Sequence, residues 1–407
     1  MKAFLRELGL AWRNVRRNRR RSLVTMFIAG LGTAAVLIAG GYTLYTYDGL
    51  REGAAREMGH ITLGHKDAFT KDEDTPMQYG LADYPRLVAE LEKDPRVHRV
   101  LPRVSLSGLV SNGDKSMIFM GTGADVQAEA AARGDFLTLT SGRLMDSSGS
   151  VVRAMLGTDL AKSLNTKVGG GLTLLATTSG GAMNAVDVVV AGTVSTGWRD
   201  LDKRLVYVDV ATAQRLMVTD KVSSLAVFLK KTGDTPAVLA DLQAKYPALA
   251  IKPWWEQAFY YFAVRDIYNR IFGLLGGIIG VLVFFSVANT LGMAVVERTR
   301  EIGTLRALGA LPGEVVAQFV REGALIGGVG SAAGMLVAAG VALSLRWAGI
   351  QMPPPPGRSI GYPLQVYVSL PLYAGTACAI VLLCAAAAWF VSRKAVRKPI
   401  VEALGHV

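Results

Sequence analysis

Residues 271–309 have the sequence IFGLLGGIIGVLVFFSVANTLGMAVVERTREIGTLRALG, in which a long uncharged run leads directly into a short charged one. The uncharged part, residues 271–295, is long enough as a helix to cross a hydrocarbon core of roughly 30 Å. The charged part keeps a helical pattern, because Ile302, Leu305 and Leu308 recur at intervals of three residues. Another uncharged run begins at Gly323. The sequence therefore predicts a short charged helix, outside the lipid, between two membrane spans.

The composition is that of a membrane protein with a large polar domain. The 407 residues are 51% hydrophobic, with a mean hydropathy of +0.32 and a net charge of +12. Residues 48–270 contain 26 Lys and Arg against 26 Asp and Glu, so the excess positive charge lies beside the apolar runs. Basic residues gather there in membrane proteins, on the cytosolic side of the spans. This distribution argues against nucleic acid as a partner.

Four runs of the chain lack charged residues and are long enough to span a membrane, namely 22–47, 271–295, 323–345 and 359–392. The first exceeds the apolar core of a signal peptide, so we expect it to be retained as a span. Basic clusters before the first span, after the second and after the fourth place all three on the cytosolic side. The predicted organisation is a cytosolic amphipathic helix at 1–21, a first span at 22–47, an extracytoplasmic domain at 48–268, a second span with its stalk at 269–296, a cytosolic helix at 297–312, a third span at 313–346, an extracytoplasmic loop at 347–368, a fourth span at 369–392 and a cytosolic tail at 393–407.

The extracytoplasmic domain has a mixed pattern, which predicts a membrane α-helical protein with a large α+β domain inserted between helices 1 and 2. Val-rich runs predict strands at 186–190, 205–210 and 222–229, and helical patterns occur at 156–164, 211–217 and 236–245. From Trp254 no clear breaker occurs before Gly273, so we expect one helix to rise from this domain into the second span.

No catalytic or metal-binding pattern emerges from the sequence. The nearest approach to a phosphate-binding loop, residues 157–163 (GTDLAKS), lacks the glycine before the lysine. His60 and His65 could share a metal, but two polar residues beside a short strand at 61–63 are the better interpretation. We therefore expect no enzyme active site and no cofactor in this chain.

Glycines spaced four residues apart predict close packing between the spans. The candidate packing residues are Gly273, Gly276, Gly277, Gly280, Gly323, Gly327, Gly330 and Gly334. Because the spans lack ionisable residues, the pattern argues against an ion channel or a proton-coupled carrier.

These features together resemble the permeases of the MacB/LolC/LolE branch of ABC transporters, the FtsX-like permease family. The resemblance covers nearly the whole chain, and the strings that carry it are AWRNVRRNRRRS at 11–22, AMLGTDLAKSLNTKVGG at 154–170, VVVAGTVSTGWRDLD at 188–202, ERTREIGTLRALGA at 297–310 and KPIVEAL at 398–404. The resemblance implies a multi-pass protein of the bacterial inner membrane, with both termini cytosolic and the large domain periplasmic or extracellular. It also implies that the extracytoplasmic domain moves as a mechanical lever.

The resemblance further implies partners. A second permease subunit would form a homodimer or heterodimer with this chain, and a separate dimer of ABC-type ATPase subunits would bind ATP and Mg²⁺. Membrane lipids surround the spans, and a periplasmic adaptor or chaperone is a further candidate partner. The residues implied to dock on the ATPase, as a coupling helix, are Glu297, Arg298, Arg300, Glu301, Ile302, Leu305, Arg306, Leu308 and Gly309. Glu297 and Glu301, four residues apart, are expected on one face of this helix, flanked by Arg298 and Arg306.

Three functions stay open on this sequence. The first is ATP-driven transport of a lipoprotein, lipid or peptide outside the membrane. The second is a non-transporting regulator that activates an envelope enzyme such as a peptidoglycan hydrolase. The third is a sensor in which residues 297–306 send a signal, which would need a kinase partner instead of an ATPase.

Overall fold

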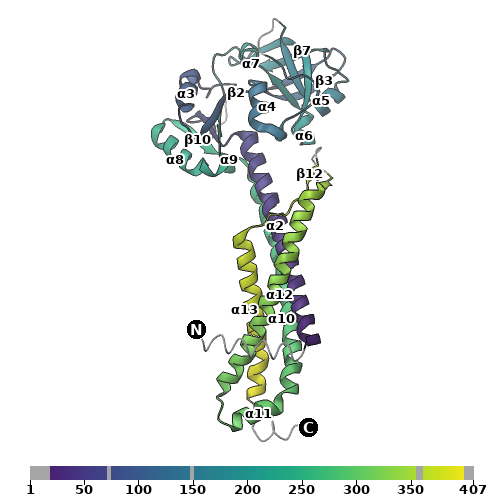
Figure 1. Ribbon diagram of the computed structural model, residues 1–407. Helices are drawn as coiled ribbons and strands as arrows, with labels where there is room; N and C mark the ends of the chain where they lie inside the picture. Colours follow the sequence, from purple (N-terminus) through teal and green to yellow (C-terminus); the bar gives the residue numbers. More distant parts are fainter. Residues whose placement is uncertain (1–18, 71–74, 147–150, 354–360, 398–407) are drawn as a thin grey trace. The chain divides into compact units, whose positions relative to one another are not determined.

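The computed structural model describes residues 19–70, 75–146, 151–353 and 361–397 (Figure 1). These residues form two compact units, one built of long helices and one of mixed strands and helices. The amphipathic helix predicted at 1–21 lies almost entirely outside the described residues, as does most of the tail predicted at 393–407.

Four described helices are long and apolar enough to cross a membrane. They are α2 (Arg19–Met58), α10 (Phe259–Glu297), α12 (Pro312–Ala348) and α13 (Leu370–Val396), and α11 (Thr299–Ala307) lies between α10 and α12. The short strands β11 (Gln351–Met352) and β12 (Tyr362–Pro363) pair between α12 and α13. The helix expected from Trp254 onward is interrupted after α9 (Trp254–Gln257), because the next residue, Ala258, has a non-helical φ of −96° and ψ of 54°.

The helical unit has an apolar interior to which α2, α10, α12 and α13 all contribute. Ala29, Val287, Ile326 and Cys384 are among its fully buried residues. A hydrogen bond of 2.8 Å between the hydroxyls of Thr25 and Thr290 joins α2 to α10. Apart from such contacts, the helices are held by close packing.

The predicted packing glycines fall into two groups. Gly330 and Gly334 on α12 face α2, where an added Cβ would lie 2.7 Å from the Met26 carbonyl oxygen and 2.3 Å from the Gly30 carbonyl oxygen, respectively. Gly323 and Gly327 face α13 in the same way, with Cys384 as the shared neighbour. On α10, by contrast, a Cβ at Gly273, Gly276 or Gly277 would meet no described atom within 4 Å, and one at Gly280 would only touch Leu383 at 3.9 Å.

Replacement of Gly330 by leucine should destabilise the helical unit, because the side chain would be forced against the α2 backbone. Overpacking of this kind costs about 1–3 kcal/mol. Gly328 is a matched control on the same helix, since a Cβ there meets nothing within 4 Å. We expect Gly330→Leu to lower the Tm of the purified protein and Gly328→Leu to leave it nearly unchanged; equal Tm values for the two variants would contradict the packing argument.

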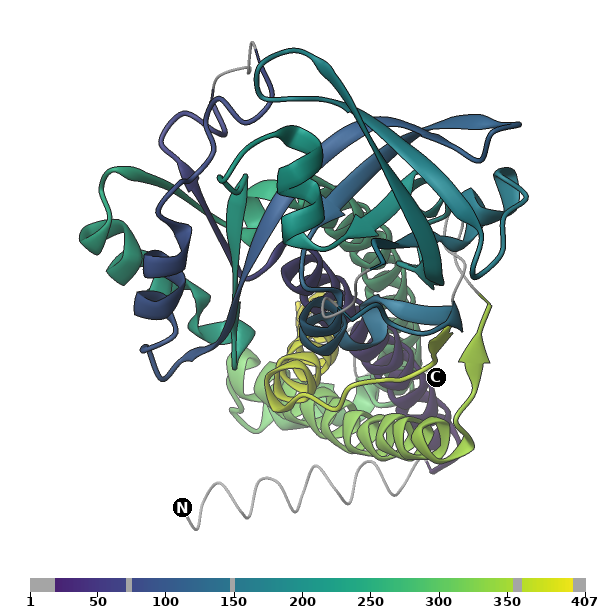
Figure 2. The ribbon, with the colours of Figure 1, turned by 90° about the horizontal axis from the view of Figure 1, so that it is seen from above.

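The mixed unit contains ten paired strands (Figure 2). They are β1 (Ile61–His65), β2 (Val97–Ser111), β3 (Ser116–Gly123), β4 (Thr138–Gly142), β5 (Arg153–Gly157), β6 (Gly171–Thr177), β7 (Met183–Ser195), β8 (Leu205–Val208), β9 (Ser224–Leu229) and β10 (Leu249–Pro253). The accompanying helices are α3 (Tyr84–Leu91), α4 (Val126–Arg133), α5 (Thr158–Ser163), α6 (Arg199–Asp202), α7 (Val210–Met217) and α8 (Thr235–Lys245), with 3-10 turns at Gly134–Phe136 and Thr232–Asp234. The strands and helices predicted from residue 156 to 245 are all present, with shifted ends.

Four strands make the first lobe of this unit, in the order β10-β1-β9-β2 with every neighbour antiparallel. With α3 between β1 and β2, and α8 between β9 and β10, this is the connectivity of a split β-α-β fold. Alternating residues of β9 bury both faces of the sheet: Leu225 and Val227 face the main core, and Phe228 packs with α4.

The second lobe begins within β2, which pairs with β9 over residues 97–103 and with β3 over residues 104–111, and it ends before β9. Its ladder runs β2-β3-β8-β5-β7, and β6 pairs with both β7 and β2, so six strands close on themselves. Side chains alternate along each strand: Leu156 and Val206 enter the interior, whereas Met155 and Tyr207 belong to a separate cluster on the other face. Strand β4 pairs with β7 beyond this closed set and is exposed along its length.

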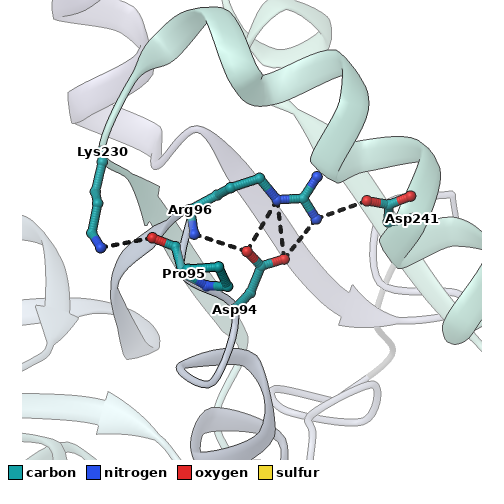
Figure 3. Close-up of polar contacts among 5 residues, drawn as sticks. All are labelled: Asp94, Pro95, Arg96, Lys230 and Asp241. Carbon is teal, nitrogen blue, oxygen red and sulfur yellow. Dashed lines mark hydrogen bonds and ion pairs between the residues drawn. The ribbon is translucent and has the colours of Figure 1, made fainter.

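Ion pairs fasten the turn between α3 and β2 to α8 (Figure 3). An Arg96 Nη atom lies 2.7 Å from a carboxylate oxygen of Asp94 and 2.7 Å from one of Asp241 on α8. Lys230, just after β9, donates a hydrogen bond to the carbonyl oxygen of Pro95. Segments far apart in the sequence are thereby joined on one side of the first lobe.

His60 is a buried histidine between α2 and β1. Its Nδ1 accepts the Leu229 N–H and its Nε2 lies 3.0 Å from the Thr232 hydroxyl. Burial lowers the pKa of His60 to about 4, with the nearby Glu52 opposing and Arg56 adding to this effect. The structure thus uses His60 as a neutral hydrogen-bonding residue, and no group of three or more potential metal ligands occurs among the described residues.

The His60 pKa predicts a loss of stability in acid. Between pH 6.5 and 4 the unfolded chain binds a proton at His60 and the folded chain does not, so stability falls as the pH falls through this window. The difference amounts to about 3 kcal/mol at pH 4. We expect His60→Asn, which preserves an acceptor for Leu229, to flatten the dependence of Tm on pH between 4 and 6.5. His98→Asn, at an exposed histidine of the same lobe, is the control; a wild-type slope in His60→Asn would refute the assignment.

Candidate functional site

The short helix α11 is separated from α10 by a turn at Arg298, whose φ of −101° and ψ of 14° interrupt the helix. The sequence also terminates α11 sharply. Gly309 has a φ of +96°, which favours glycine, and the N–H groups of Gly309 and Ala310 donate to the carbonyls of Arg306 and Leu305. Pro312 then begins α12.

One side of α11 is anchored in the helical unit. Ile302 is buried in a cluster with Val295, Val315, Phe319 and Val396, which come from α10, α12 and α13. The Thr299 hydroxyl donates to the carbonyl oxygens at the end of α10. These contacts fix the position of α11 relative to three long helices.

Arg298 is part of this anchor. Its guanidinium lies 3.5 Å from the Glu322 carboxylate of α12, and the two side chains are only 8% and 5% exposed. The expectation that Arg298 flanks an exposed face is therefore wrong. The helical pattern of the sequence predicts that Arg298 is a surface residue. The break after Glu297 turns its side chain inward, where the Glu322 carboxylate compensates its charge.

The opposite side of α11 is exposed. Arg300 and Glu301 are exposed, as are Leu305 (44%) and Leu308 (81%), and Leu311 follows at 64%. Arg306 is half-buried and Gly309 is exposed. Leucines rarely gather on an exposed surface without a partner, so this side of α11 has the character of a binding surface.

Glu297 does not belong to that surface. It is the last residue of α10, and its carboxylate pairs with the Arg21 guanidinium of α2. The prediction that Glu297 and Glu301 share one helix face is wrong, because the turn at Arg298 places the two residues on different helices.

A second charged junction lies in the mixed unit, at the end of α2, and sequence analysis missed it. Arg103 of β2 donates to the carbonyl oxygens of Glu57 and Met58, the last residues of α2, at 3.2 and 2.9 Å. The same guanidinium pairs with both carboxylate oxygens of Glu129 on α4, at 2.6 and 2.8 Å. A cation at these unpaired carbonyls stabilises the helix end, and the buried Glu129 holds the cation there.

Two family models match the chain. The MacB-like periplasmic core domain matches residues 22–245, more than half of the chain, and the FtsX-like permease C-terminal domain matches residues 273–400. The chain belongs to the MacB/LolC/LolE family of FtsX-like permeases. It is an ABC transporter permease with four membrane helices and an extracytoplasmic α+β domain between the first two of them.

Individual relatives agree with this assignment. The permease is 25% identical over 343 residues to the lipoprotein-releasing system transmembrane protein LolC of Neisseria meningitidis, covering 81% of this chain and 80% of that one. It is 26% identical over 355 residues to the lipoprotein-releasing system transmembrane protein LolE of Haemophilus influenzae, covering 83% and 82%. Over 363 residues it is 24% identical to the pyoverdine export ATP-binding/permease protein PvdT of Pseudomonas putida, covering 85% of this chain and 53% of that protein.

Loss of the Glu322 carboxylate should loosen α11. Breaking a buried ion pair costs about 3–5 kcal/mol, because the remaining charge stays buried, whereas replacing both partners by apolar residues is often neutral. We expect Glu322→Leu to speed tryptic cleavage after Arg300 and Arg306, and the double variant Arg298→Leu/Glu322→Leu to return the rate toward wild type. Asp114→Leu, at an exposed turn of the mixed unit, is the control. Wild-type cleavage rates in Glu322→Leu would show that the pair does not anchor α11.

Proposed function

We propose that this permease couples ATP hydrolysis by a separate cytosolic ATPase dimer to movements of its extracytoplasmic domain. The observation that carries the proposal is the two-sided character of α11. Arg298 and Ile302 anchor one side to the long helices, while Glu301, Leu305 and Leu308 lie exposed on the other. A helix that is fixed to the long helices on one side and carries exposed leucines on the other can pass the movement of a docked partner to those long helices.

The distribution of basic residues supports a cytosolic position for α11. The Arg21–Glu297 pair and the cluster around Ile302 bring together the start of α2, the helix α11 and the last turn of α13. These helix ends carry the basic residues Arg21, Arg300, Arg306, Arg393 and Lys394. Basic flanks favour the cytosol. We therefore assign this end of the helical unit, with both termini of the chain, to the cytosolic face of the bacterial inner membrane.

Two continuous helices supply a path from this end to the extracytoplasmic domain. Helix α10 has 39 residues, from Phe259 to Glu297, and α2 has 40. At about 1.5 Å per residue each is nearly 60 Å long, well beyond the thickness of a bilayer. A displacement of α11 would act on α10 directly, and the Arg103 junction would make the end of α2 move with β2 and α4.

The names of the relatives support a cargo drawn from lipoproteins, lipids or peptides. The relatives in Neisseria meningitidis and Haemophilus influenzae are named as parts of lipoprotein-releasing systems. We propose that this permease pairs with a second permease subunit, the same or different, and hands cargo to a periplasmic adaptor or chaperone. Recovery of a peptidoglycan hydrolase with the complex, without any cargo, would instead indicate the non-transporting regulator.

Glu301→Lys tests the proposed coupling. If the exposed side of α11 docks on an ATPase subunit that accommodates a carboxylate, the introduced cation places a repulsive contact in the interface, which costs several kcal/mol. We expect ATPase co-purification to fall at least about tenfold, since about 1.4 kcal/mol corresponds to that factor. Leu308→Asp should act in the same way by placing a charge in an apolar contact.

Asp114→Lys is the matched charge reversal, because Asp114 is exposed at the turn between β2 and β3 in the extracytoplasmic domain. This control should keep wild-type ATPase association and turnover. The measurements are co-purification and ATP hydrolysis in lipid nanodiscs, with Tm as the check on folding. Wild-type association in both α11 variants would remove this helix from the mechanism.

A further inference from the structure

The extracytoplasmic domain contains a cavity of about 800 Å³ that the coupling role of α11 does not use. Its lining residues come from the ends of α2, α4, β6 and α7, from α6, from the segment after β1, from strands β2, β3 and β8, and from the start of β9. All of them belong to the same compact unit. The volume falls within the range of small-molecule sites, roughly 300–1,000 Å³.

One part of the cavity wall is cationic. Arg133, at the end of α4, is only 4% exposed and donates from Nη1 to the Tyr207 hydroxyl at 2.7 Å. Its Nε has no hydrogen-bond partner among the described residues. Burial raises the pKa of Tyr207, although Arg133 opposes this, so the Tyr207 hydroxyl keeps its proton at neutral pH. Arg133 and Tyr207 both line the cavity.

The charge of Arg133 differs from that of Arg103 in having no paired carboxylate among the described residues. Arg103 also lines the cavity, but both oxygens of the fully buried Glu129 carboxylate pair with it. Within the described part of the chain, no carboxylate oxygen forms an ion pair with Arg133. Glu57 lines the cavity as well; its side chain is half-buried, and among the described residues it forms no ion pair with Arg133. A buried cation without a close anion is costly, and an anionic ligand would remove that cost.

The remaining wall is largely apolar. Phe69, Met77, Leu106, Met120 and Met217 contribute to it, from the segment between β1 and α3, from β2, from β3 and from the end of α7. Methionine is a flexible and polarisable side chain that adapts to apolar ligands of irregular shape. Met120 is 54% exposed, so the apolar part of the cavity is open to solvent.

We propose that this cavity binds an anionic amphiphile, with a carboxylate or phosphate group at Arg133 and Tyr207 and a hydrocarbon portion against the methionines and Phe69. Arg133 would donate hydrogen bonds to the anionic group from its guanidinium, and the Tyr207 hydroxyl would donate a further hydrogen bond. The site lies wholly within the extracytoplasmic domain, and its existence does not depend on the coupling role proposed for α11.

The test uses the full-length permease in phosphatidylcholine nanodiscs and a dodecanoic acid that carries a diazirine near the end of its chain. After irradiation, mass spectrometry locates the modified peptides. We expect labelling of peptides that contain Met120 or Met217, in addition to background labelling of the membrane helices. Dodecanoate or dodecyl phosphate should compete, and dodecanol and inorganic phosphate should not; which of the two anionic amphiphiles competes better identifies the head group.

Two variants and one control sharpen the test. Arg133→Gln removes the charge at similar size and should reduce labelling of the cavity peptides about tenfold, since hydrogen bonds to charged groups are strong. Met120→Trp fills the open side of the cavity and should reduce labelling without touching Arg133. Arg143→Gln, at an exposed arginine outside the cavity, should label as wild type does. Absence of cavity labelling in the wild-type protein, or equal competition by dodecanol, would overturn the proposal.

Discussion

Close approach of helix backbones is the constraint on which the helical unit depends. Its interior has few polar contacts, and hydrophobicity alone does not hold helices together when the surrounding lipid is equally apolar. Helix α12 meets this constraint with four glycines, two against α2 and two against α13. The helix that directly follows α11 is thus closely packed against two of its neighbours. A shift of α12 would therefore displace α2 and α13 as well.

Buried charges mark the ends of the two longest helices. Arg298 follows the last residue of α10 and pairs with Glu322, and Arg103 caps the last carbonyls of α2 and pairs with Glu129. In both cases the arginine joins a helix end to an element that is distant in the sequence. A buried pair adds little net stability but is costly to break, so it favours one geometry over its alternatives.

The features that the sequence predicted correctly are those set by local composition. The four membrane helices follow from uncharged length, and the inserted α+β domain follows from its neutral charge balance and mixed periodicity. The order of the strands could not be predicted, because β1 pairs with β10 and β2 pairs with β9 across more than a hundred residues. Likewise, Arg103, Glu129, Arg133 and Tyr207 lie on three elements, and no short motif connects them.

The error at Arg298 has a specific physical origin. A period of 3.6 residues extends smoothly from residue 297 to 309, so the pattern alone predicts one helix with Glu297 and Glu301 on one face. The observed break depends on Glu322, twenty-four residues further along and on another helix, which offers a buried arginine its countercharge. With Arg298 turned inward and Glu297 paired to Arg21, the predicted coupling residues that remain on the exposed side are Arg300, Glu301, Leu305, Leu308 and Gly309. That smaller surface is more apolar than the sequence suggested, which favours a docked protein over a solvated turn.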